Sequence, residues 1–394
     1  MSHPTGNEFV RALLAGLEDR GLLARFFTTI NAPRDGVAAL LPGAMRRQLA
    51  RRAFDVPRGK VTCNPGREIA RMLGRRGSAA AVDAVYAGMD RFVASWIEGR
   101  AREFDIVHCY EDAAAETFLA AGKAGIRRVY ELPIAYWETV QGILREEAGR
   151  SPAWEPTLSA TRDPDEKLAR KTREAELADV VVCPGKFVLE SLPAAIRAAK
   201  KCVIATFGSP SAPPGARRDG ADGKLRVLFA GSMSQRKGLA DLFAAMKLLD
   251  RTEVELVVLG TPILPMSFYR EQYDGFIHEP PRPHSDVMRL MQTCDVLALP
   301  SLVEGRALVQ QEALACGLPI IVTANAGGED LVREGETGFL VPVRAPEKIA
   351  EKIAWFAEHR AELPAMREAA TRKAAEYTWE DYARAIIEAG GARP

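Results

Sequence analysis

Two loops in the second half of the chain carry the residue types that bind phosphates and sugar hydroxyls. The first loop, GSMSQRKG, runs from Gly231 to Gly238 and follows the apolar run LRVLFA. Glycine lets a backbone approach a ligand closely, and a cation pair at a helix start suits a diphosphate, because free N–H groups and the helix dipole favour an anion there. Arg236 can fork onto phosphate oxygens, whereas Lys237 acts as a point charge. A solvated surface turn is the alternative, and the spacing is not that of a P-loop.

The second loop holds two carboxylates eight residues apart. Glu304 and Glu312 lie in PSLVEGRALVQQEALACGLP, directly after the apolar run VLAL. Glu304 falls in a predicted strand-to-helix loop and Glu312 within the helix, which the following Gly and Pro end. Carboxylates in these places can accept hydrogen bonds from the vicinal hydroxyls that sugars and ribose offer. The backbone groups expected to face the ligand at the helix start are those of Gly305, Arg306, Ala307 and Leu308.

Alternating strands and helices must position these loops. Short apolar runs recur through the second half, separated by amphipathic helical stretches, and the predicted strands are 225–230, 254–259, 296–299, 319–322 and 338–341. Continuous apolar strands between such helices indicate a parallel sheet covered on both faces, as in a Rossmann-like doubly wound α/β domain. Ligands of that fold bind at the carboxyl ends of the strands, where both loops fall. The first half shows the same alternation less regularly and predicts a second α/β domain.

A Pro- and Gly-rich stretch divides the chain. Residues 209–224, SPSAPPGARRDGADGK, have little to bury and form the predicted linker. The N-terminal domain is expected over 1–208 and the C-terminal domain over 225–376. Residues 377–394 are amphipathic, which predicts a helix that packs back toward the N-terminal domain.

The carboxylate pair resembles a known signature. Within CDVLALPSLVEGRALVQQEALACGLPIIV, Glu304 and Glu312 are similar to the E-x7-E motif of retaining glycosyltransferases of the GT-B fold, family four (glycosyl transferases group 1). The similarity continues in VLFAGSMSQRKG and AGGEDLVREGETGFLVP, covers 225–394, and is weaker over 104–208. It implies two Rossmann-like domains facing each other across a cleft. It also implies transfer of a hexose from a nucleoside diphosphate sugar to a saccharide or lipid-linked acceptor, with retention and without an obligatory metal or other cofactor.

The resemblance implies a role for each matching residue. Glu304 is the expected catalytic carboxylate, in contact with hydroxyls of the transferred sugar, and Glu312 holds the ribose hydroxyls. The residues expected at the donor diphosphate are Gly231, Ser232, Arg236 and Lys237, with the backbone of Gly305, Arg306, Ala307 and Leu308 beside the sugar and phosphates. The candidates in the N-terminal domain are His108 and Glu131 near the reacting carbon, and Gly6 and Asn7 in the acceptor-side loop.

Departures from the family pattern keep alternatives open. Ser232 stands where the family usually has Arg, Arg306 and Ala307 stand where it usually has an aromatic residue and Gly, and RRVYELPIAYW lacks the usual histidine. Arg306 is expected either to contact a phosphate or to change which sugar fits. The alternatives to a transferase are a non-catalytic nucleotide-sugar-binding or scaffold protein, and a sugar-nucleotide epimerase or a phosphorylase on the same fold.

The formal net charge of +1 conceals an asymmetry between the two halves. Residues 1–76 carry a net +8 and residues 225–394 a net −5. Four arginines at 46, 47, 51 and 52 fall on one side of a predicted helix, which suits an anionic membrane surface or a polyanionic acceptor. Nucleic acid is not expected, because the segment lacks interleaved aromatic residues. With no apolar run long enough to span a bilayer, we expect a cytoplasmic enzyme of surface or extracellular glycan assembly, in peripheral contact with the inner face of the membrane.

Overall fold

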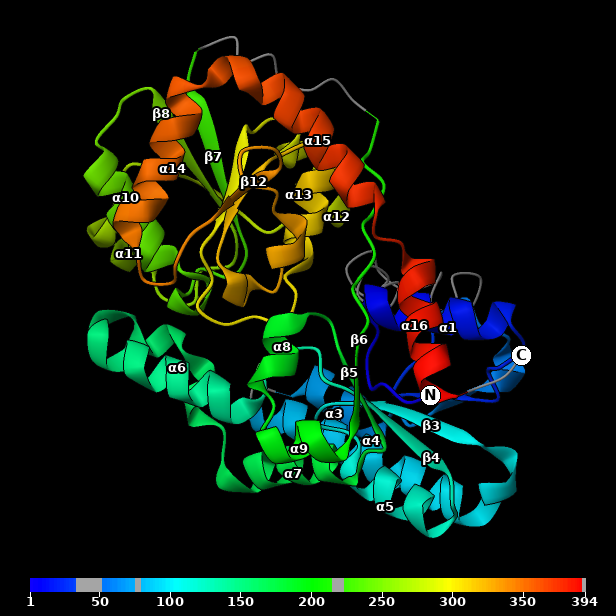
Figure 1. Cartoon of the computed structure of the whole chain (residues 1–394). Coiled ribbons are helices and arrows are strands. Elements are labelled where there is room, and N and C mark those ends of the chain that lie inside the picture. The colour runs from blue at the N-terminus through cyan, green and yellow to red at the C-terminus, as the bar shows by residue number, and fades with distance from the viewer. Residues whose placement is uncertain (33–51, 75–78, 215–222, 392–394) are drawn as a thin grey trace.

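Two separate parallel sheets divide the chain into an N-terminal and a C-terminal α/β domain (Figure 1). The computed structural model describes residues 1–32, 52–74, 79–214 and 223–391. The C-terminal sheet has the strand order β9-β8-β7-β10-β11-β12, and every neighbouring pair is parallel. Its strands are β7 (Leu225–Ala230), β8 (Val254–Leu259), β9 (Phe276–Glu279), β10 (Val296–Leu299), β11 (Ile320–Val322) and β12 (Gly338–Leu340).

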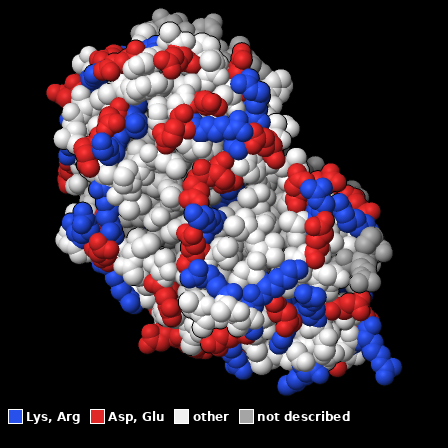
Figure 2. Space-filling model, viewed as in Figure 1, with Lys and Arg blue, Asp and Glu red and all other residues white. Residues whose placement is uncertain are grey.

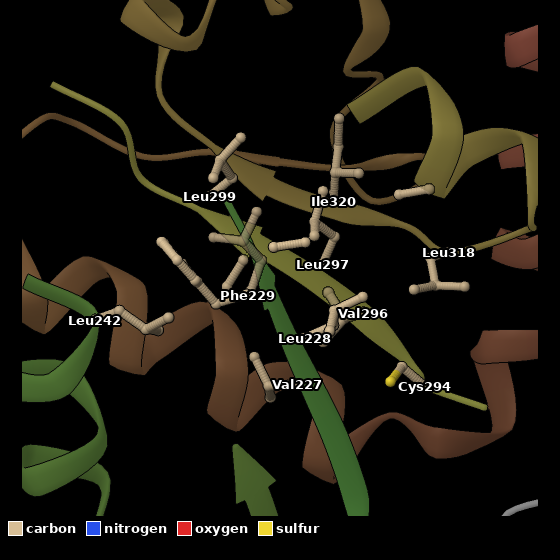
Figure 3. Close-up of a cluster of buried hydrophobic side chains, with 14 of the residues drawn as sticks. Val227, Leu228, Phe229, Leu242, Cys294, Val296, Leu297, Leu299, Leu318 and Ile320 are labelled. Carbon is tan, nitrogen blue, oxygen red and sulfur yellow. The ribbon is translucent and has the colours of Figure 1, made fainter. Parts of the chain in front are cut away.

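This order reverses between β7 and β10, so the loops that follow those two strands meet at the switch point of a doubly wound sheet. Helices cover both faces of the sheet, which is why its strands are continuous apolar runs. They are α10 (Leu239–Leu249), α11 (Met266–Gln272), α12 (His284–Met291), α13 (Leu308–Ala315), α14 (Pro346–Glu358) and α15 (Leu363–Ala375). Figure 3 shows the core around Phe229 and Leu297, where side chains of β7, β10 and β11 interdigitate.

The N-terminal sheet contains β1 (Phe26–Thr28), β2 (Val61–Cys63), β3 (Ile106–Tyr110), β4 (Arg127–Glu131), β5 (Val180–Cys183) and β6 (Lys201–Ile204). Ser2 lies between β1 and β3 and forms parallel bridges to Phe27 and Cys109. The amino end of the chain thus takes the place of a short strand that joins β2-β1 to β3-β4-β5-β6. The helices of this domain are α1 (Glu8–Asp19), α3 (Gly66–Leu73), α4 (Ala79–Arg100), α5 (Ala115–Lys123), α6 (Trp137–Arg150), α7 (Asp165–Leu177), α8 (Lys186–Ser191) and α9 (Ala194–Ala199).

The last helix, α16 (Trp379–Gly390), leaves the C-terminal domain and packs beside α1 (Figure 1). Together α1 and α16 cover one face of the N-terminal sheet, and Tyr382 and Ile386 are buried in that layer. The chain first crosses between the domains near Ser209 and crosses back near Tyr377. The Ser209 N–H donates to the Tyr377 carbonyl over 3.0 Å. The two crossings therefore lie side by side. Residues 215–222 of the predicted linker lie outside the described residues.

A segment of the N-terminal domain also packs on the C-terminal domain. The segment formed by α6 and the 3-10 helix η4 (Pro152–Thr157), called the arm below, extends from the N-terminal domain under α11 (Figure 1). Trp154 of the arm is buried in the core of the C-terminal domain, with its ring 5.0 Å from that of Phe268 and 5.7 Å from that of Tyr269. The two domains therefore share apolar packing in addition to the crossings.

Both signs of charge are interspersed over both domains on the face shown in Figure 2. Among the helices described here, none combines the length and the apolar character that a membrane span requires. Most of the predicted basic helix, including Arg46, Arg47 and Arg51, lies outside the described residues. Arg52 is described, and it forms an ion pair with the buried carboxylate of Glu68.

Candidate functional site

The loops after β7 and β10 touch at the switch point of the C-terminal sheet. Residues Gln235–Lys237 form the 3-10 helix η6, and Gly238 follows with φ +76°. A Cβ at Gly238 would overlap the carbonyl group of Pro300, so both the φ angle and the close approach require glycine there. The Leu302 N–H donates to the Arg236 carbonyl over 2.9 Å. These contacts bring the predicted phosphate-binding loop against the loop that carries Glu304.

Arg236, Lys237 and Glu304 form one charged cluster. The Glu304 Oε1 atom lies 2.6 Å from the Arg236 Nη1 atom and 2.6 Å from the Lys237 Nζ atom. Their side chains are only 26%, 12% and 11% exposed in the order Arg236, Lys237, Glu304. Burial lowers the pKa of Lys237, and the neighbouring Arg236 lowers it further, while Glu304 opposes the change. Two partly buried cations beside one carboxylate leave a net positive site that suits a diphosphate.

The start of α13 differs from the sequence-based expectation at the Ala307 backbone, and the Arg306 side chain is bound within the domain. The Ala307 N–H donates to the Ala326 carbonyl over 3.2 Å, so it is already occupied and does not face a ligand. The Arg306 side chain points into the domain, fully buried, and its guanidinium binds Asp330 at 2.8 Å and 3.1 Å. It also lies 4.9 Å from the ring centre of Tyr377. A carboxylate 24 residues further along the chain binds the Arg306 side chain, which contradicts the expected phosphate contact; an effect of Arg306 on which sugar fits stays a prediction.

Glu312 lies on α13, with a side chain that is 17% exposed. Burial raises the pKa of Glu312; the His284 ring, 3.6 Å away, lowers it, and Glu8 raises it. Glu8 begins α1 in the N-terminal domain, so the start of α1 faces α13 across the domain boundary. Asn7 caps α1 by accepting a hydrogen bond from the Val10 N–H over 3.2 Å, and Gly6 packs against the ring of Phe54.

A cavity of about 410 Å³ lies at the carboxyl end of β3 in the N-terminal domain. Its polar lining consists of His3, Thr5, Asn7, Asp83, Tyr86, Tyr110, Glu111, Asp112 and Lys167. Pro133 also lines the cavity, and a Cβ on Gly305 would overlap the Pro133 carbonyl, while Ile134 forms an antiparallel bridge to Gly305. The cavity therefore ends where the loop that carries Glu304 and Gly305 touches the N-terminal domain. Asn7 is the one residue of the predicted acceptor-side loop that lines it.

His108 and Glu131 do not line this cavity. Both point to the face of the sheet that α1 and α16 cover, where the His108 Nε2 atom lies 3.1 Å from the Glu131 Oε2 atom. The hydroxyl of Tyr382 on α16 donates to Glu131 Oε1 over 2.6 Å, and the Tyr110 ring packs on that of His108 at 4.9 Å. Burial raises the pKa of the Tyr382 hydroxyl. The structure thus corrects the placement of both candidates: they lie in a buried cluster that holds α16, away from the cavity.

Sequence reasoning also missed Gln235 and the arm. Gln235 is fully buried, and it contacts Thr157 and Glu147 of the arm, residues about 80 positions earlier in the chain. Local patterns carry no signal for such a pairing. The polar lining of the cavity was equally hidden, because its members come from four separate segments.

Comparison with solved structures identifies the fold as GT-B. Sucrose-phosphate synthase from Thermosynechococcus elongatus superposes with a TM-score of 0.66 at 16% identity, over 96% of this chain and 91% of that one. HepE from Anabaena, solved with UDP and glucose, gives 0.62 at 17% identity over 100% and 98% of the two chains. WaaG, a glycosyltransferase involved in lipopolysaccharide biosynthesis, gives 0.63 at 14% identity over 99% and 98%. The predicted fold, two Rossmann-like domains in the GT-B arrangement, is confirmed.

Sequence comparison then specifies the family. Residues 216–374 match the family model of the glycosyl transferases group 1. D-inositol 3-phosphate glycosyltransferase from Corynebacterium urealyticum is 35% identical over 108 residues, which are 27% of this chain and 26% of that protein. The protein of the same name from Mycobacterium tuberculosis is 36% identical over 114 residues, 27% and 23% of the two chains. The matches span about a quarter of the length of these curated relatives.

Proposed function

We propose that this protein is a retaining glycosyltransferase that moves a hexose from a nucleoside diphosphate sugar to a saccharide or lipid-linked acceptor. The observation that carries the proposal is the cluster of Arg236, Lys237 and Glu304 at the switch point, which adjoins the acceptor-side cavity through Gly305 and Pro133. A sugar donor at the cluster and an acceptor in the cavity would meet at that contact. Related proteins of this family and fold act on, or have been solved with, sugars and UDP.

The charged cluster has a role in the departure of the leaving group. When the glycosidic bond to the donor breaks, negative charge develops on the diphosphate, and fixed cations stabilise that charge. Arg236 and Lys237 supply this countercharge, so the proposed reaction has no obligatory metal. Glu304 forms ion pairs with both cations and offsets part of their charge. Once the diphosphate takes over that role, the carboxylate can accept a hydrogen bond from a hydroxyl of the transferred sugar.

Glu312 has a separate role in binding the nucleoside. It lies on α13, eight residues after Glu304, with little exposure, and its carboxylate can accept hydrogen bonds from the two ribose hydroxyls. Asn7 and the other polar residues of the cavity would bind the acceptor hydroxyls.

The test is a transfer assay with UDP- and GDP-hexoses, in the presence of EDTA, with a panel of saccharide and lipid-linked acceptors. We expect turnover in the wild type, a product with the anomeric configuration of the donor, and a loss of at least about a hundredfold in Glu304→Gln. Glu336→Gln, an exposed carboxylate of the same domain, is the control. Tight nucleotide binding without turnover on any acceptor would favour the non-catalytic alternative, whereas full turnover in Glu304→Gln would refute the site.

The proposal extends to a peripheral contact with an anionic membrane surface through the basic segment of the first domain. Its support is compositional, since residues 1–76 carry a net +8. Co-sedimentation with vesicles of anionic and of neutral lipids, for the wild type and a variant with Arg46, Arg47 and Arg51 changed to Gln, tests it. Equal binding of both proteins to anionic vesicles would refute the assignment.

A further inference from the structure

Gln235 is a buried polar side chain directly before the two cations of the donor site. It is 0% exposed, and each of its polar groups has a partner. Its backbone N–H donates to the Thr157 hydroxyl over 3.1 Å, and its side-chain Nε2 donates to Glu147 at 2.9 Å and to Asp241 at 3.1 Å. Its Oε1 accepts from the Ala240 N–H over 2.8 Å. The 3-10 turn that carries the cations is therefore fixed by Gln235 from two sides.

Two of those partners, Thr157 and Glu147, belong to the arm of the other domain. Glu147 is 2% exposed and accepts three hydrogen bonds in all: its Oε2 accepts from Arg344 Nε at 2.8 Å, and its Oε1 accepts from Gln235 and from the Ser151 hydroxyl at 3.0 Å. Arg344 follows β12 and has φ +58°, a conformation that is uncommon outside glycine. A buried carboxylate with this many donors is held in a single position.

The arm is itself anchored in the C-terminal domain. Trp154 lies between Glu147 and Thr157 and is 4% exposed, packed on Phe243, Phe268 and Tyr269. The Thr157 hydroxyl donates to the Trp154 carbonyl over 2.6 Å, which orients its oxygen to accept from Gln235. The indole anchor, the hydroxyl and the carboxylate thus act as one unit on the same turn.

We infer that the arm of the N-terminal domain is a positioning element for the donor site, and that Glu147 and Thr157 set the place of Arg236 and Lys237 through Gln235. The expected effect of the arm on donor binding rests on the proposed function. None of the arm residues touches the expected donor; they act through the backbone of the 3-10 turn. The cations of one domain are therefore ordered only while the arm of the other domain is docked.

The experiment compares four variants of the full chain with the wild type. Thr157→Val removes the hydroxyl that accepts from the Gln235 N–H. Glu147→Gln leaves a neutral amide with one acceptor oxygen, which cannot serve both Gln235 and Arg344 as the carboxylate does. Both changes alter the side-chain volume little. Thr157→Ser keeps the hydroxyl, and Glu146→Gln is the matched control, because Glu146 also binds Arg344, at 2.7 Å, but is 58% exposed and does not reach Gln235. The two readouts are amide hydrogen exchange over residues 231–242 in the free protein and the Kd for UDP or GDP, whichever the wild type binds more tightly.

We expect exchange over 231–242 to accelerate about tenfold and the Kd to rise about tenfold in Thr157→Val and Glu147→Gln, with Thr157→Ser and Glu146→Gln close to the wild type. Unchanged exchange in the first two variants would overturn the inference. Faster exchange with an unchanged Kd would show that the arm only supports the structure, and this result would also overturn the inference. If the wild type binds neither nucleotide, the proposed function fails, while the exchange data still decide whether the arm orders the turn.

Discussion

Replacing Lys237 by Met tests the proposed donor site most directly. The change keeps a linear side chain beside Gly231 and removes the ammonium group that lies 2.6 Å from Glu304. A hydrogen bond to a charged group contributes about 1.5–3 kcal/mol, which corresponds to roughly a ten- to 150-fold rise in Kd. We expect the upper part of that range, because Glu304 would then have one cationic partner instead of two and would repel the diphosphate more strongly.

Folding should suffer less than binding in this variant. Burial lowers the pKa of Lys237 and so disfavours its charged form. Removing the charge therefore removes a desolvation penalty, which offsets part of the stability lost with the ion pair. The assay is isothermal calorimetry with UDP and GDP, alongside thermal unfolding, and Lys247→Met on the exposed side of α10 is the control. A Kd for Lys237→Met within about twofold of the wild type, with the control also unchanged, would refute the reasoning.

Three further perturbations probe the surroundings of the site. In Gly305→Ala the new methyl group overlaps the Pro133 carbonyl, so we expect the two domains to separate locally. Amide exchange at Ile134 should then rise and sugar transfer should fall at least about tenfold, whereas unchanged exchange would contradict the contact. Arg306→Met breaks an ion pair whose partner Asp330 is 40% exposed, so we expect the free energy of unfolding to fall by about 2 kcal/mol. Tm should then be lower by roughly 4–8 °C, and a shift below about 1 °C would contradict this expectation. Burial raises the pKa of Asp241 to about 6 from 3.8, so the native state retains a proton that the unfolded chain releases, and stability falls as pH rises through this range. Asp241→Asn should therefore raise Tm at pH 8, by the equivalent of about 3 kcal/mol, with the gain disappearing by about pH 4; a gain independent of pH would exclude the carboxyl as its source.

The C-terminal domain could be predicted closely because its strands are buried on both faces. Predicted strands 225–230, 254–259 and 296–299 coincide with β7, β8 and β10, since such runs are uniformly apolar. The strand Phe276–Glu279 was not predicted, because it lies at the sheet edge and its last residues are polar and partly exposed. Edge strands lose the pattern that identifies central ones.

The two halves of the charged cluster were also predictable as neighbours, because each is a local motif at the end of a buried strand. The structure brings Arg236, Lys237 and Glu304 together because β7 and β10 are neighbours. By contrast, the alternation of side chains along β3 and β4 places His108 and Glu131 on the face of the sheet that α16 covers. That helix begins more than two hundred residues later in the chain. No local pattern tells which face of a strand a distant helix will close.

The position of α16 also has a consequence for the order in which the protein is completed during synthesis. Translation produces the N-terminal domain first, yet one apolar face of its sheet receives Tyr382, Ile386 and Ile387 only after the entire C-terminal domain has been made. Nascent chains usually finish their domains in order from the amino end. Here the earlier domain would wait on the ribosome with that face uncovered, so chaperone dependence and aggregation of stalled or truncated chains should concentrate on the surface that α16 finally closes.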